Sequence, residues 1–182
     1  MKKTDALILV DVQKGFRDPV WGPRNNPNAE QMIEALISLW RSFERPIIHI
    51  QHLSLDRNSP LHPESSGSEF MEIAQPMGNE RVMSKQVNSA FIGTELETVL
   101  RSENFKNLIF CGFTTDHCIS TSVRMAKNLG FSPTVVADST VAFDRVDYRG
   151  TRYQADLVHA VSLASLKDEF ADIREAKYFL EN

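Results

Sequence analysis

Hydrophobic positions along the chain follow two spacings: short apolar runs, and longer segments with an apolar residue every three or four positions. The runs predict strands at residues 6–12, 46–53, 81–85, 107–112 and 134–137, with a weak last strand at 171–174. The longer segments predict helices at residues 27–44, 94–103, 120–129 and 153–167. A capping-box pattern at Thr94-Glu95-Leu96-Glu97 opens one of these helices, and Gly130 suits the left-handed end of another.

Strands that are nearly all apolar and alternate with amphipathic helices indicate a parallel sheet that is covered on both faces. We therefore predict an α/β fold in three layers, α/β/α, formed by a single domain over residues 1–182. Its six-stranded, mainly parallel sheet is expected in the order 3-2-1-4-5-6, with right-handed crossovers. In that order strands one and four are neighbours at the switch point, where ligands bind beyond the carboxyl ends of strands.

Composition narrows the classes of partner. The chain has 182 residues, 42% of them hydrophobic, and its net charge of −4 comes from interspersed acids and bases. Without a basic stripe we expect no nucleic-acid or membrane surface, and a small molecule is the expected partner. Residues 54–79, rich in Ser, Pro, Gly and His, form the one long irregular region, which we interpret as a lid or a subunit contact.

The cysteine count and the N-terminus bear on location. Met1-Lys-Lys-Thr-Asp5 runs into an apolar stretch that Asp11 interrupts too early for the core of a signal peptide. Two cysteines cannot form a disulfide framework, and Cys111 lies within a predicted strand while Cys118 opens a predicted helix. We expect a reduced, cytoplasmic protein.

The segment Cys111-Gly-Phe-Thr-Thr-Asp-His-Cys118-Ile places a thiol at the start of a helix, with Thr114 or Thr115 as the N-cap. Unpaired backbone N–H groups and the positive end of the helix dipole favour a thiolate there and could receive an oxyanion. The alternative reading is that Cys118 is a small buried hydrophobic residue.

Two other strands end in charged residues. Asp11 directly follows Leu7-Ile-Leu-Val10, and Lys85 ends Arg81-Val-Met-Ser-Lys85. In the predicted topology an acid, an ammonium and the Cys118 thiol could therefore meet at one end of the sheet. Their distances do not follow from the sequence.

Three matching segments give the chain a family resemblance. They are Leu9-Val-Asp11-Val-Gln-Lys-Gly-Phe16, Lys85-Gln-Val-Asn-Ser-Ala-Phe91 and Gly112-Phe-Thr-Thr-Asp-His-Cys118. In order and spacing the chain resembles, from about residue 6 to residue 164, the isochorismatase-like cysteine hydrolases, which include nicotinamidases and N-carbamoylsarcosine amidohydrolases.

This resemblance implies a catalytic triad of Asp11, Lys85 and Cys118. It also implies a non-proline cis peptide between Phe113 and Thr114, and an oxyanion hole formed by the N–H groups of Thr114 and Cys118. The implied enzyme is a cofactor-independent hydrolase that attacks a C–N bond of a small amide, imide or carbamoyl substrate through a thioester. Family members commonly assemble as dimers or tetramers, so we expect a homo-oligomer.

Aromatic residues beside these segments are candidate walls for an acyl group. Phe16 and Trp21 follow Asp11, and Phe91 follows Lys85, so we assign all three to substrate binding, with ordinary packing as the alternative. His117 adjoins the cysteine, but neighbouring helical side chains point about 100° apart, which disfavours it as the base.

Several other polar residues are expected to have structural rather than catalytic roles. Asp116 is expected to cap the helix or to orient its loop, His159 to pack or to lie in an interface, and Asp138 to cap the turn at Ser139-Thr140. We expect no metal. Metal-binding nicotinamidases have Asp-x-His after strand two, whereas this chain has Ile50-Gln-His52. Asp56 and His62 follow in the loop, and His49 should face the opposite side of the strand from His52.

Three other functions remain as alternatives. Hydrolysis of an isochorismate-like vinyl ether is one, although family members with that activity are thought not to need the cysteine. A non-catalytic interaction protein on the same fold is another. Dinucleotide binding is disfavoured because the chain after strand one lacks the Gly-x-Gly-x-x-Gly turn.

Overall fold

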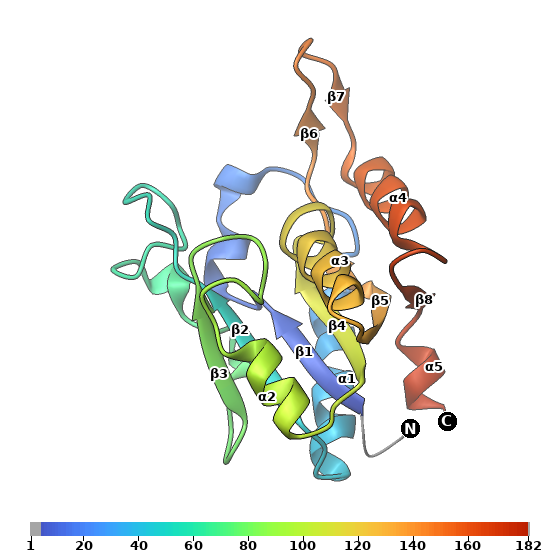
Figure 1. Cartoon of the computed structure of the whole chain (residues 1–182). Coiled ribbons are helices and arrows are strands. Elements are labelled where there is room, and N and C mark those ends of the chain that lie inside the picture. Colours follow the sequence, from blue (N-terminus) through green and yellow to red (C-terminus); the bar gives the residue numbers. More distant parts are fainter. Residues whose placement is uncertain (1–4, 182) are drawn as a thin grey trace.

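A six-stranded parallel sheet forms the centre of the molecule (Figure 1). The computed structural model describes residues 5–181. The strands of the sheet are β1 (Asp5–Val10), β2 (Ile47–His52), β3 (Arg81–Lys85), β4 (Asn107–Phe113), β5 (Ser132–Val141) and β8 (Asp172–Arg174). Their order is β3-β2-β1-β4-β5-β8, and every neighbouring pair is parallel. The predicted fold class and strand order are confirmed, with β8 as the sixth strand of the sheet.

Helices cover both faces of the sheet, as the nearly all-apolar strands require. On one face, Leu7 and Leu9 of β1 pack in a core with α1 (Ala29–Ser42) and α5 (Lys177–Leu180). On the other face, Ile8 and Val10 pack in a core with α2 (Leu96–Ser102) and α3 (Ser120–Asn128). α4 (Ala155–Leu166) lies beside α3 (Figure 1). Among the described residues, no helix combines the length and the hydropathy needed to cross a membrane.

The structure differs from the sequence-based expectations in three local features. A hairpin of β6 (Arg145–Val146) and β7 (Arg152–Tyr153) was not predicted, and it projects beyond the carboxyl end of the sheet (Figure 1). The late helix therefore begins at Ala155, after Tyr153 has paired in β7. The capping box does not form: the Thr94 hydroxyl accepts from the Leu96 N–H and donates to the Ala90 carbonyl, and α2 begins at Leu96.

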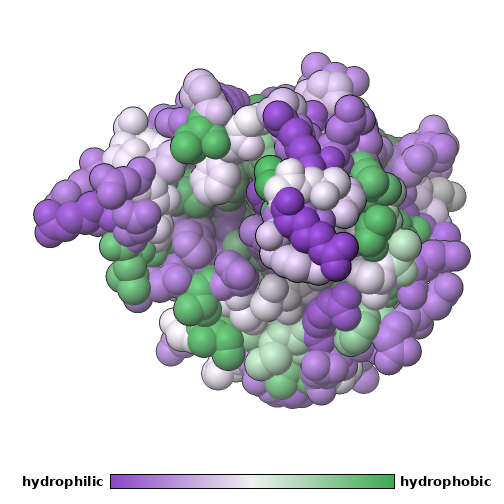
Figure 2. Space-filling view, turned by 90° about the horizontal axis from the view of Figure 1, so that it is seen from above, coloured by the Kyte–Doolittle hydropathy of each residue, from purple (hydrophilic) through white to green (hydrophobic). Residues whose placement is uncertain are grey.

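Residues 54–79 form a long loop that is packed onto the segment after β1. The loop contains two short 3-10 turns, η3 (Ser66–Ser68) and η4 (Glu72–Ala74), and its Gly67 lies against Gly15 of η1 (Lys14–Arg17). A Cβ on Gly67 would stand 2.3 Å from the Pro60 carbonyl oxygen, so only glycine permits this approach. In Figure 2, which looks onto the carboxyl end of the sheet, the loop stands out at the left as a largely hydrophilic projection.

Candidate active site

The carboxyl ends of three strands bring the predicted acid, ammonium and thiol together. Asp11 follows β1 with a left-handed φ of 55°, and Lys85 is the last residue of β3. β4 ends at Phe113, the Phe113–Thr114 peptide is cis, and the following π-helical turn, η5 (Thr115–Ile119), carries Cys118. Because these strands are parallel, all three side chains reach the same edge of the sheet.

Lys85 is the centre of this cluster. Its Nζ lies 2.8 Å from Asp11 Oδ2, 3.3 Å from Cys118 Sγ and 2.9 Å from His52 Nδ1. The side chains of Asp11 and Lys85 are fully buried, and Cys118 is 7% exposed. Removing an ion pair from water costs several kcal/mol per ion, so each charge depends on the other for compensation.

One oxygen of Asp11 is left over. Oδ2 receives the Lys85 ammonium, whereas Oδ1 is buried and accepts no hydrogen bond from the described residues. A buried carboxylate oxygen without a donor is costly, and such an atom in a native site calls for an explanation. One explanation is that Asp11 Oδ1 serves as a proton acceptor close to the Cys118 thiol.

Burial controls the protonation states of the site. Desolvation raises the pKa of the Cys118 thiol, the negative charge of Asp11 raises it further, and Lys85 opposes both. Desolvation also raises the pKa of Asp11, against the pull of Lys85. The expectation that the helix start lowers the pKa of the thiol is therefore wrong for this site, since burial outweighs the dipole. Burial thus favours the protonated form of the Cys118 thiol.

Gly112 allows β4 to approach β1 at this point. It pairs in register with Val10, and its φ is +121°, a left-handed value that favours glycine. A Cβ at this position would lie 2.0 Å from the Val10 carbonyl oxygen. The glycine therefore sets the distance between the strand that leads to Asp11 and the strand that leads to the Cys118 turn.

Asp11, His52 and Cys118 also form a possible metal-ligand set, because their ligand atoms lie within 4.8 Å of one another. The Lys85 ammonium, however, is hydrogen-bonded to all three, so a divalent cation would have to displace a buried positive charge. The geometry therefore does not fit a resident metal.

The other candidate ligands lie apart from this set. His49 is on the opposite side of β2 and is hydrogen-bonded to Glu80. Asp56 accepts the Asn58 N–H, and the His62 ring accepts the Glu64 N–H, so both stabilise turns of the loop.

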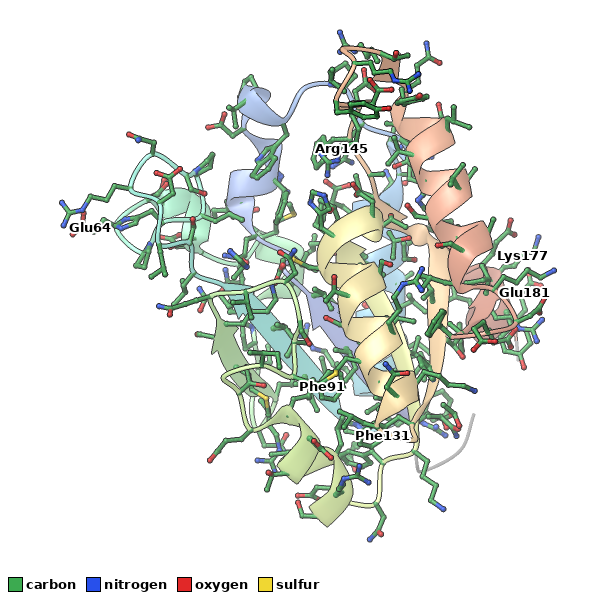
Figure 3. The ribbon with its side chains drawn as sticks, turned by 45° about the horizontal axis from the view of Figure 1, so that its top comes forward. Glu64, Phe91, Phe131, Arg145, Lys177 and Glu181 are labelled. Carbon is green, nitrogen blue, oxygen red and sulfur yellow. The ribbon has the colours of Figure 1, made fainter. Side chains whose placement is uncertain are left out.

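The three aromatic candidates occupy two different places. Phe16 stacks on Trp21 at 5.1 Å and on Phe113 at 4.9 Å between ring centroids, so these rings adjoin the cis peptide. Phe91 instead stacks on Phe131 in the core between α2 and α3. Figure 3 shows Phe91 and Phe131 close together and away from Arg145 at the hairpin. The structure thus gives Phe91 a packing contact and leaves Phe16 and Trp21 as candidate walls.

Ion pairs and hydrogen bonds from the hairpin and α4 hold the Cys118 turn. Arg145 Nε donates to Asp116 Oδ2 at 2.6 Å, and the His159 ring is hydrogen-bonded to the Thr115 hydroxyl at 2.9 Å. Asp116 thus orients the loop, and His159 packs against it, as expected. Asp138 differs from its prediction in part, because its carboxylate accepts from the Ala176 N–H as well as from the Ser139 hydroxyl.

Sequence reasoning missed three residues around the cluster. His52 contacts Lys85, and Asn88 Oδ1 lies 3.8 Å from Cys118 Sγ. The buried Gln13 amide donates to the carbonyls of His52 and Ser68 and accepts the His52 N–H, which ties the loop to β2. Gln13 and Asn88 lie inside two of the three quoted segments, and His52 ends a strand, so each carried a positional signal.

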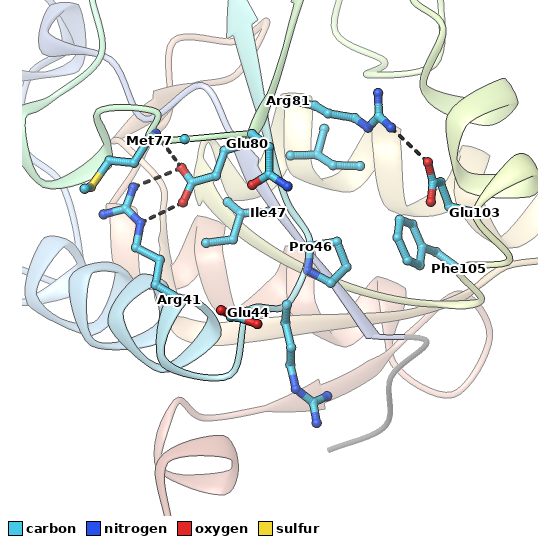
Figure 4. A pocket seen from close by; sticks show the side chains of 13 residues that line it. Arg41, Glu44, Pro46, Ile47, Met77, Glu80, Arg81, Glu103 and Phe105 are labelled. Atoms are coloured by element: carbon cyan, nitrogen blue, oxygen red, sulfur yellow. Dashed lines mark hydrogen bonds and ion pairs between the residues drawn. The ribbon is translucent and has the colours of Figure 1, made fainter.

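The hollow in Figure 4 lies at the opposite edge of the sheet. Two ion pairs line it, Arg41 with Glu80 and Arg81 with Glu103. It surrounds the start of β2, whereas the Lys85 cluster lies at the strand's end. This hollow is therefore separate from the candidate active site.

Fold and site together define an α/β protein with a buried acid, ammonium and thiol at the carboxyl edge of its parallel sheet. The sequence profile of the isochorismatase domain matches residues 5–177. The chain belongs to the isochorismatase family, and its relatives identify it as a hydrolase.

Individual relatives cover most of the chain. The uncharacterized isochorismatase family protein YrdC of Bacillus subtilis is 45% identical over 173 residues, 95% of this chain and 92% of the relative. A crystal structure of an isochorismatase-family protein from Chromobacterium violaceum has a TM-score of 0.95 at 40% identity, covering 99% of this chain and 93% of that one. The maleamate amidohydrolase of Pseudomonas putida is 26% identical over 154 residues, 73% of this chain and 70% of the relative.

Proposed function

We propose that this hydrolase uses Cys118 as a nucleophile on the carbonyl carbon of a small amide, imide or carbamoyl compound and cleaves its C–N bond. The observation that carries the proposal is the buried contact of Lys85 Nζ with both Asp11 and Cys118, beside the unpartnered Asp11 Oδ1. The likeness to a maleamate amidohydrolase supports C–N cleavage.

In the first half-reaction Asp11 Oδ1 takes the thiol proton as Cys118 Sγ attacks the carbonyl carbon. The carbonyl oxygen becomes an oxyanion, which the N–H groups of Thr114 and Cys118 receive. When the tetrahedral intermediate collapses, the C–N bond breaks and Asp11 returns the proton to the departing ammonia or amine. A thioester on Cys118 remains.

In the second half-reaction a water molecule attacks the thioester and gives a proton to Asp11. Collapse expels the sulfur, which recovers the proton, and the carboxylic acid leaves. Lys85 holds Asp11 in place throughout and balances the negative charge that moves between carboxylate and sulfur. A thiol with a raised pKa fits this scheme, because the proton is transferred only when the substrate is present.

A mass measurement on Cys118 tests this function. The protein is incubated with a panel of small primary amides and carbamoyl compounds that includes maleamate, quenched in acid and digested. We expect an acyl adduct on Cys118, ammonia release by the unaltered protein, and loss of both in Cys118→Ser with folding intact.

Cys111→Ala is the matched control, since it removes a buried free thiol that makes no hydrogen bond to the cluster within residues 5–181. This variant should keep the adduct and the ammonia release. Full turnover by Cys118→Ser would overturn the covalent mechanism.

A further inference from the structure

His52 stands beside the nucleophile in a fixed position. It is the last residue of β2 and pairs in register with Lys85 of β3. The Gln13 side chain holds its backbone from both sides, accepting the His52 N–H at 2.7 Å and donating to its carbonyl at 2.9 Å. The ring is half-buried, and one of its nitrogens lies within 4.8 Å of Asp11 and Cys118 ligand atoms.

Lys85 determines which ring nitrogen carries the proton. An ammonium group has three donors and no acceptor, and the contacts of Nζ with Asp11 Oδ2, His52 Nδ1 and Cys118 Sγ account for all three. His52 Nδ1 must therefore offer its lone pair, which leaves the proton of a neutral ring on Nε2. Burial, and next the charge of Lys85, lower the pKa of His52, in agreement with a neutral ring.

The Nε2–H group is a donor that the protein leaves available. Within residues 5–181 this group makes no hydrogen bond, and its nitrogen is not fully buried. It is therefore accessible from outside the protein. A fixed donor on the far side of the ring from Lys85 is suited to bind an acceptor oxygen.

We propose that His52 is a substrate-binding residue whose Nε2–H group donates to a carbonyl or carboxylate oxygen of the substrate while Lys85 holds the ring in that tautomer. This inference rests on the proposed function, because it places the substrate beside Cys118. It narrows the substrate class to small amides that carry an acceptor oxygen within reach of the imidazole edge.

The tautomer is tested first, on the full chain with labelled histidine. ¹⁵N NMR at pH 7.5, with the His52 signals assigned by their loss in His52→Gln, should show Nδ1 unprotonated and Nε2 protonated. The measurement needs no substrate or turnover, so it is independent of the Cys118→Ser result. A proton on Nδ1, or a doubly protonated ring, would overturn the proposal.

The donor is tested with iodoacetamide, a small amide that alkylates cysteine, in the Cys111→Ala background. The variants are His52→Leu, which has neither donor nor acceptor, and His52→Gln, which can accept from Lys85 and donate outward. Loss of one hydrogen bond to the reagent should raise its half-saturating concentration about tenfold in His52→Leu, with the maximal rate nearly unchanged.

His52→Gln should return the half-saturating concentration to within about twofold of the unaltered protein, a factor well below that of one hydrogen bond. A purely structural role would instead lower the maximal rate in both variants. An unchanged half-saturating concentration in His52→Leu, a failed rescue by His52→Gln, or alkylation without saturation in the unaltered protein would each overturn the proposal.

Discussion

Replacing Lys85 by Met should expose the cost of an unpaired carboxylate in the core. The methionine keeps an apolar stem but removes the ammonium that lies 2.8 Å from Asp11 Oδ2. Both side chains are fully buried, so water cannot take over this role. Removing one partner of a buried ion pair costs about 3–5 kcal/mol, and we expect that loss in the free energy of unfolding at pH 7.

The loss should depend on pH with a definite sign. Loss of the ammonium removes the attraction that favours the carboxylate, so the pKa of Asp11 should rise further above its ordinary value. A carboxyl whose native pKa is raised above its unfolded value does not destabilise the folded protein below the unfolded pKa, near 3.9. It destabilises the folded protein as the pH rises through the native pKa. The destabilisation should therefore be small near pH 4 and full at neutral pH.

Urea unfolding followed by far-UV circular dichroism at several pH values measures this effect. Lys127→Met, at an exposed position of α3, is the matched control and should leave stability nearly unchanged. Asp11→Asn combined with Lys85→Met should recover part of the loss, because it removes the stranded charge. A Lys85→Met loss that equals the control, or that does not vary with pH, would refute the reasoning.

The other predictions concern the site's spacing, protonation and support. Gly112→Ala must push β4 away from β1, so urea unfolding should show a loss of about 2 kcal/mol or more in the free energy of unfolding. The loss should be smaller for Gly130→Ala, whose added Cβ meets nothing within 4 Å. Because burial raises the pKa of Asp11, kcat/KM should fall as pH drops through a midpoint above 3.8, and a lower midpoint would contradict Asp11 as the base. Arg145→Ala removes a partly buried ion pair that supports the Cys118 turn, so kcat should fall several-fold, and equal activity in Arg145→Ala and the hairpin-tip control Arg149→Ala would exclude that support.

The fold could be predicted because its signals are local. Each central strand is an apolar run, such as residues 7–10, and the alternation with helices leaves few topologies to consider. The hairpin was missed because β6 and β7 have two residues each, too few to show alternation. The capping box failed because Thr94 found another partner, the Ala90 carbonyl, which only the folded loop provides.

The clustering of Asp11, Lys85 and Cys118 could be predicted from the sequence, whereas the electrostatics of the cluster could not. Asp11, Lys85 and Cys118 lie at strand ends, and parallel topology alone brings strand ends together. The contact of His52 with Lys85 depends on the register of β2 against β3, which the sequence does not show. The protonation of Cys118 depends on how deeply the packed core buries it, whereas the sequence shows only the helix start.

Burial limits how many charges the site can hold at once. A thiolate held permanently in this core would add a second negative charge beside Asp11, with the single ammonium of Lys85 to balance both. Keeping Cys118 protonated leaves one compensated pair, and transfer of its proton to Asp11 moves the negative charge from oxygen to sulfur without changing the total. Lys85 contacts both atoms, at 2.8 Å and 3.3 Å, so it can stabilise the charge in either position. In the proposed mechanism the nucleophile is therefore formed by moving a proton within a neutral cluster, which avoids the cost of an additional buried ion.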